Sequence, residues 1–197
     1  MLTKTQIEIM KVFVSKINEK FSIKQISEII KKAYPLVHRS IKSLLNDGIL
    51  IKDSKELISL NYRGDSQHIA YVESLRKNKI LKNKTISLFI KDTLNKINLD
   101  FFVFLIFGSS VESKDPRDVD ILLIIQEKEK INEVEKIVAN IASNFSKKFD
   151  IHIISAESAY EMLNKRDSSN ILNETLNKHI LLFGAENYYR ILKNARQ

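Results

Sequence analysis

The sequence predicts an α+β protein made of two domains with a helical segment between them. Three observations predict this class: apolar residues recur at helical spacing through residues 1–62, short apolar runs alternate with helical segments from residue 100 onward, and the charge balance changes along the chain. Residues 1–62 carry 11 basic and 6 acidic side chains, residues 63–99 carry 8 and 3, and residues 100–197 carry 13 and 15. We therefore expect a first domain over 1–62, a helical linker over 63–99, part of which packs on the next domain, and a second domain over 100–197.

The composition excludes several classes of protein. The chain has 197 residues, a net charge of +8 and 44% hydrophobic residues, enough for packed cores. It has no cysteine, which excludes disulfides, thiolate zinc sites and cysteine nucleophiles. No apolar run is long enough to span a membrane, and the first residues are unlike a signal peptide. We expect a cytoplasmic protein with no membrane partner.

Three helices and a hairpin are expected in the first domain. The helices cover residues 4–18, 22–31 and 34–48. Ser22 is suited to cap the second helix, Pro35 to begin the third, and Gly48 to end it. Two short strands follow, over residues 49–52 and 56–60, with a turn between them.

The stretch FSIKQISEIIKKAYPLVHRSIKSLLNDGILIKD, residues 21–53, resembles the winged helix-turn-helix family. In that family the third helix enters the major groove of DNA, so its exposed side chains are polar or basic. The apolar positions expected to face the core are Val37, Ile41, Leu44 and Leu45. The resemblance implies nucleic-acid contacts, with DNA or RNA, from His38, Arg39, Lys42 and Ser43 on the helix and from Lys52 and Lys55 on the wing. The alternative is that this module contacts only protein, as a dimerisation piece.

The segment from 66 to 97 is expected to form two helices. Its middle, the stretch LRKNKILKNK, gathers the basic residues Arg76, Lys77, Lys79, Lys82 and Lys84. They could form a stripe that binds a polyanion, but we favour the solvated face of a connecting helix.

The second domain is expected to contain a small mixed sheet covered by helices. The expected strands cover residues 101–107, 119–125, 150–155 and 179–183. The expected helices cover residues 127–149, 157–164, 168–178 and 185–194.

The stretch FLIFGSSVESKDPRDVDILLI, residues 104–124, carries the strongest chemical signal. Asp118 and Asp120 stand at i and i+2 of an expected strand, so their carboxylates point to one face. Two adjacent like charges are tolerated when a cation lies between them, and oxygen ligands favour Mg²⁺ or Mn²⁺. Asp150 joins this pair if its strand is the neighbour, and Gly108 and Ser109 would let backbone N–H groups and a hydroxyl hold a phosphate.

This pattern resembles the polymerase-beta-type nucleotidyltransferase superfamily, especially its minimal prokaryotic members. The matching positions are Gly108, Ser109, Asp118, Asp120 and Asp150, within a resemblance that covers roughly residues 85–190. It implies that the three aspartates bind metal and catalyse transfer from an NTP substrate, and that Gly108 and Ser109 bind the nucleotide. The loop lacks the family's second glycine and has Arg117 where serine is common, so we expect Lys114 and Arg117 to supply positive charge to the nucleotide.

Two functions remain open from the sequence. The first is a Mg²⁺-dependent nucleotidyltransferase that moves an NMP from an NTP to a hydroxyl of a nucleic acid or a protein, targeted by the winged helix. The alternative is a DNA-binding transcriptional regulator or antitoxin-like protein whose second domain senses nucleotide or is inactive. A toxin-like partner protein or a second copy of the chain would then be its partner.

Overall fold

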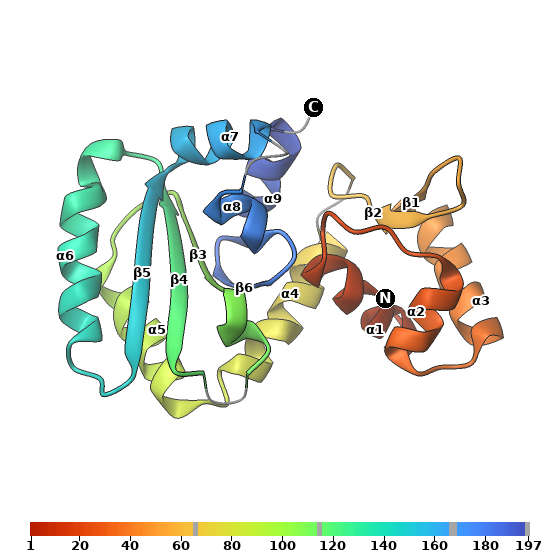
Figure 1. Cartoon of the computed structure of the whole chain (residues 1–197), viewed down its shortest axis with the longest axis horizontal. Helices are drawn as coiled ribbons and strands as arrows, with labels where there is room; N and C mark the ends of the chain where they lie inside the picture. The colour runs from red at the N-terminus through yellow and green to blue at the C-terminus, as the bar shows by residue number, and fades with distance from the viewer. Residues whose placement is uncertain (65–66, 114–115, 166–168, 196–197) are drawn as a thin grey trace. The chain divides into compact units, whose positions relative to one another are not determined.

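The protein is an α+β protein, as the sequence predicts, and its computed structural model describes residues 1–64, 67–113, 116–165 and 169–195. The chain divides into two compact units, Met1–Glu73 and Ser74–Gln197. Each unit is described by itself below, with the elements labelled as in Figure 1.

The first unit begins with three helices, α1 (Lys4–Ser15), α2 (Ile23–Ile30) and α3 (Tyr34–Asn46). Ser22 caps α2 as predicted: its side chain accepts a hydrogen bond from the Gln25 N–H while the Gln25 side chain accepts one from the Ser22 N–H. Pro35 lies in the first turn of α3 and Gly48 follows its end at φ +67°. These signals fix where the helices begin and end.

A two-stranded antiparallel hairpin, β1 (Leu50–Lys52) and β2 (Ile58–Leu60), completes the small core of this unit. Helix α4 (Gln67–Ile80) follows and contains the boundary between the units. Three of the four α3 positions expected in the core are fully buried, while Leu45 is only half-buried. The buried core residues on the three helices are Ile9, Met10, Phe13, Val14, Ile26, Val37, Ile41 and Leu44.

The second unit is built on a mixed four-stranded sheet in the order β5-β4-β3-β6. The strands are β3 (Phe102–Phe107), β4 (Asp118–Ile125), β5 (Lys148–Ser155) and β6 (His179–Phe183). β3 is antiparallel to both β4 and β6, whereas β4 and β5 are parallel. The strands lie close to their expected positions, and the sheet is mixed as predicted.

Helices cover both faces of this sheet (Figure 1). Helices α5 (Lys84–Lys96) and α6 (Ile131–Ala142) pack on the face that carries Val119 and Ile121, where the Phe89 ring stacks on Phe149 with centroids 3.9 Å apart. Leu122 and Ile124 point to the opposite face, since side chains alternate along a strand, and are fully buried there. Helices α7 (Ala156–Asn164) and α9 (Ala185–Ala195) contact β3, β4 and β5 and each other, and the short α8 (Ile171–Thr175) packs on α7.

Helix α6 is shorter than the expected helix over 127–149. A 3₁₀ turn (Lys128–Lys130) precedes it, and β5 begins at Lys148. The Ser143 hydroxyl and the Asn144 side-chain amide both donate hydrogen bonds to the Asn140 carbonyl. Such side-chain bonds compete with the main-chain bonds that would continue a helix, so α6 ends here.

Candidate functional site

Gly108 directly follows β3, one of the two inner strands of the sheet, and begins a 3₁₀ turn, Gly108–Val111. Its φ of +68° is in the left-handed region, where L side chains are strained. A Cβ at this position would lie only 2.8 Å from Asp120 Oδ2. Glycine is favoured here for two reasons: the backbone conformation, and the close approach of the Asp120 carboxylate, which would have to turn away from an added Cβ.

The Gly108 N–H, one of the backbone groups expected to hold a phosphate, has a hydrogen-bond partner within the chain. That N–H donates a hydrogen bond of 3.1 Å to the carbonyl of Lys178, just before β6. The Ser109 side chain is exposed, whereas the Ser110 hydroxyl is buried and donates to the Phe107 carbonyl at 2.6 Å. Of the two serines, only Ser109 presents its side chain to solvent.

The register of the sheet brings the acidic residues together on one face. Asp120 lies opposite Asp150 on β5 and opposite Phe107 on β3, and Asp118 lies opposite Lys148. Because side chains alternate along a strand, all of these residues lie on the same face of the sheet as Leu122. The side chain of Asp118 is 47% exposed and that of Asp150 is 54% exposed. The expected meeting of Asp150 with the pair on β4 is supported by this register.

The electrostatics of this group single out Asp120. Partial burial and the neighbouring Asp150 and Asp118 carboxylates raise the pKa of Asp120 above its ordinary value, although His152 opposes this effect. Asp118 Oδ2 lies 3.8 Å from Lys148 Nζ, and Asp150 Oδ2 lies 3.7 Å from His152 Nε2. Among the described residues, each outer carboxylate thus has a basic neighbour within ion-pair distance and Asp120 has none.

The donor set consists of hard carboxylate oxygens, which suit Mg²⁺ or Mn²⁺. As the side chains stand, no group of three or more His, Asp or Glu within the described ranges could hold a metal ion. Asp118 and Asp150 are half-exposed side chains directed at Lys148 and His152, and rotation of both toward Asp120 would be needed to form such a group. A metal site at this position stays a prediction.

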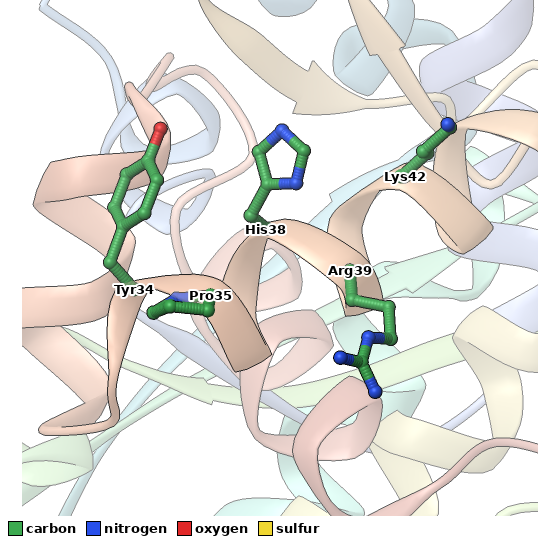
Figure 2. Close-up of a pocket in the computed structure, with 5 residues that line it drawn as sticks. All are labelled: Tyr34, Pro35, His38, Arg39 and Lys42. Carbon is green, nitrogen blue, oxygen red and sulfur yellow. The ribbon is translucent and has the colours of Figure 1, made fainter.

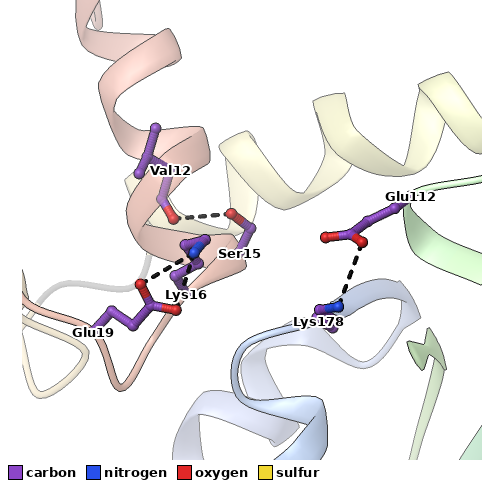
Figure 3. Close-up of polar contacts among 6 residues, drawn as sticks. All are labelled: Val12, Ser15, Lys16, Glu19, Glu112 and Lys178. Atoms are coloured by element: carbon purple, nitrogen blue, oxygen red, sulfur yellow. Dashed lines mark hydrogen bonds and ion pairs between the residues drawn. The ribbon is translucent and has the colours of Figure 1, made fainter. Parts of the chain in front are cut away.

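Two further basic residues that the sequence did not indicate lie beside this group. The Lys148 side chain contacts Asp118, and the main-chain carbonyl of Lys178 accepts the hydrogen bond from the Gly108 N–H. Figure 3 shows the Lys178 side chain directed at Glu112, with Nζ and Oε2 3.4 Å apart. Of the two basic residues that the sequence did predict, Arg117 is exposed next to Asp118 and Lys114 lies outside the described residues.

A second candidate site lies on α3 in the first unit. Tyr34, Pro35, His38, Arg39 and Lys42 line an open pocket on the surface of this helix (Figure 2). His38, Arg39 and Lys42 were predicted from the sequence, whereas Tyr34 and Pro35 were missed because they mark the beginning of the helix. The signal that could have found Tyr34 is its spacing of four residues from His38, which puts both on one helix face.

The other predicted nucleic-acid contacts are not part of this pocket. The Ser43 hydroxyl is directed back toward its own unit, where it accepts a hydrogen bond from Gln6 Nε2 at 3.1 Å. Lys52 forms an ion pair with Glu56 across the hairpin turn. Lys55 is exposed in the same turn. The pocket on α3 therefore brings together three of the six residues that were predicted to contact nucleic acid.

Among the described residues, no helix has the length and the apolar character needed to cross a membrane. No protein-family model matches the chain. No curated protein and no solved structure is significantly similar to it either.

Proposed function

We propose that the second unit is a nucleotidyltransferase-like domain that transfers an NMP from an NTP to a hydroxyl of a nucleic-acid or protein acceptor. The observation that carries this proposal is the meeting of Asp118, Asp120 and Asp150 on one partly exposed sheet face, with Gly108 packed against Asp120. The order of these residues supports it too, because a Gly-Ser turn after a strand, an Asp-x-Asp pair and a later lone Asp resemble the polymerase-beta-type family.

The residues of the chain have separate roles in this proposal. Asp118 and Asp120 hold the metal, and Ser109 and Arg117 contact the phosphates of the NTP. A bound Mg²⁺ or Mn²⁺ supplies charge stabilisation for the triphosphate and lowers the pKa of the attacking hydroxyl. The acceptor oxygen forms a bond to the α-phosphorus, the bond from that phosphorus to the bridging oxygen breaks, and pyrophosphate leaves. Asp150 completes the metal site and takes the proton of the acceptor hydroxyl.

The test is transfer of label from each α-labelled NTP, with Mg²⁺ or Mn²⁺, to any component of a cell lysate. Wild type is compared with the double variant Asp118→Asn/Asp120→Asn, and Asp92→Asn serves as a matched control because Asp92 is an exposed carboxylate on α5. We expect label transfer by wild type and Asp92→Asn only, and sensitivity of the product to nuclease or protease then names the acceptor. Transfer by the double variant, or no transfer under any condition, contradicts the proposal.

A second proposed function, nucleic-acid binding by the first unit, is favoured by a specific observation about charge. Four lysines of this unit are used in ion pairs, Lys16 with Glu19, Lys20 with Asp53, Lys32 with Glu8 and Lys52 with Glu56. Arg39 and Lys42 are among the cations of this unit that have no ion pair among the described residues; both are exposed and lie close together on α3. Unpaired cations on one helix face suit a polyanion.

In this second proposal the first unit is a winged helix that either recruits the acceptor of the reaction or makes the protein a regulator or antitoxin-like protein. The order of its elements, three helices followed by a hairpin, supports this assignment. The test is the affinity of the full chain for labelled nucleic acid as a function of salt. Lys16→Ala, which removes a paired lysine, is the control for Arg39→Ala. Equal loss of affinity in both variants, or binding only to another protein, contradicts the use of α3.

A further inference from the structure

The pocket on α3 contains two exposed aromatic rings next to one another. The Tyr34 and His38 ring centroids are 6.0 Å apart and their planes differ by 30°. Tyr34 is 49% exposed, although tyrosine is a large side chain with much apolar area. Figure 2 shows Tyr34, His38 and Lys42 extending from the same side of the helix, as their spacing of four residues requires.

Both rings are exposed, and neither belongs to the buried core of the first unit. The core side of α3 is filled by Val37, Ile41 and Leu44, which are fully buried. The rings lie on another side of the helix and leave aromatic surface open to solvent. The pair therefore has the arrangement of a stacking platform rather than of a packing contact.

The two cations of the pocket complete a surface suited to a nucleic acid. Arg39 and Lys42 have no ion pair within the described ranges, and no acidic side chain lines the pocket. Sites for single-stranded nucleic acid combine cations for the phosphates with aromatic rings on which bases stack. Reading of duplex DNA instead relies on polar groups at base edges, because the faces of paired bases are covered by their neighbours.

We infer that this α3 face binds single-stranded RNA, with an unpaired base stacked on Tyr34 beside His38 and the backbone phosphates on Arg39 and Lys42. Unpaired, splayed-out bases are the usual targets when proteins recognise RNA. The inference rests on the proposed nucleic-acid binding of the first unit and narrows its ligand to one class. It is independent of the reaction proposed for the second unit.

The absence of tryptophan from the chain allows a direct test. Tyr34→Trp would place a single indole on the platform, and a base that stacks on it quenches its fluorescence. Leu36→Trp is the matched control, because Leu36 is 44% exposed on the same helix but about 200° around it from Tyr34. The full-length variants are titrated with a single-stranded RNA of mixed sequence, with DNA of the same sequence, and with each strand annealed to its complement.

We expect the RNA single strand to bind most tightly and to quench Tyr34→Trp but not Leu36→Trp. Tyr34→Ala should weaken the binding of a fluorescein-labelled RNA about tenfold or more, and Tyr34→Trp should preserve it. Tighter binding to duplex or to DNA, or equal quenching in both tryptophan variants, overturns the inference while the proposed nucleic-acid binding stands. If no nucleic acid binds, both this inference and the proposed nucleic-acid binding of the first unit are overturned. The nucleotidyl transfer proposed for the second unit is tested separately, by the label-transfer assay.

Discussion

Three glycines in the left-handed region give a graded test of the geometry at the candidate active site. Gly48, Gly108 and Gly184 have φ values of +67°, +68° and +73°. An alanine at any of them therefore pays nearly the same backbone strain, about 1–2 kcal/mol. Alanine also restricts the unfolded chain to the same extent at each position. Differences between the three variants then report what the added methyl group meets in the folded protein.

The contacts predict a clear order of destabilisation. A Cβ at Gly48 meets nothing within 4 Å, so Gly48→Ala should lose only the strain, about 1–2 kcal/mol. A Cβ at Gly108 lies 2.8 Å from Asp120 Oδ2, a side-chain atom that can turn away at an added cost of about 1 kcal/mol. A Cβ at Gly184 lies 2.2 Å from the Phe102 carbonyl oxygen, so the backbone of β3 itself must move and the loss should exceed about 4 kcal/mol.

Urea unfolding of the full chain, followed by circular dichroism, measures this series. Each variant is compared with wild type, and the transition of the unit that carries the substitution is the one that should shift. If Gly184→Ala is no more destabilised than Gly48→Ala, then Gly184 does not lie as close to the backbone of β3 as the structure has it. If Gly108→Ala leaves the titration of Asp120 unchanged, followed by NMR of the carboxyl carbons, then Gly108 and Asp120 are not in contact.

Two further predictions concern charge. Without metal at pH 7, Asp120→Asn should raise the free energy of unfolding by less than about 1 kcal/mol, since it removes a partly buried charge and its screened repulsion from Asp150 and Asp118. Because the pKa of Asp120 is raised in the folded protein, the stability of wild type falls as the pH rises from the ordinary aspartate pKa through the raised one. The greater stability of Asp120→Asn should therefore vanish when thermal melts are recorded in acid, below the ordinary aspartate pKa. Arg39→Ala and Lys42→Ala should each reduce the slope of log affinity for single-stranded RNA against log salt by about 0.7, whereas an unchanged slope means no phosphate contact.

The local signals in the sequence predicted the first unit well. Ser22 caps α2, Pro35 lies in the first turn of α3, and Val37, Ile41 and Leu44 are buried as their spacing predicts. Each of these features depends on residues within about one helical turn, so the sequence alone contains the relevant information. The same is true of β3 and β4 in the second unit, whose apolar runs stop before Gly108 and Gln126.

Contacts between distant segments could not be predicted in this way. The Gly108 N–H bonds to Lys178, which lies about seventy positions later, and Ser43 bonds to Gln6 rather than facing a ligand. The early end of α6 depends on side-chain bonds to Asn140 that a hydrophobic periodicity does not record. In each case tertiary packing determines which partner a polar group bonds to. The residue type alone is compatible with several partners, so the sequence does not predict the bond.

The arrangement of charge around Asp120 gives the strongest argument for a cation at the candidate active site. Asp118 and Asp150 each have a basic neighbour, Lys148 and His152, at the outer sides of the group. Asp120, between them, has no ion pair among the described residues, and partial burial together with both neighbouring carboxylates raises its pKa. Repulsion is therefore concentrated where Gly108 leaves room for the carboxylate, and a divalent cation bound there would relieve it most. This predicts that Mg²⁺ protects wild type against heat more than it protects Asp120→Asn, although the variant is the more stable of the two without metal.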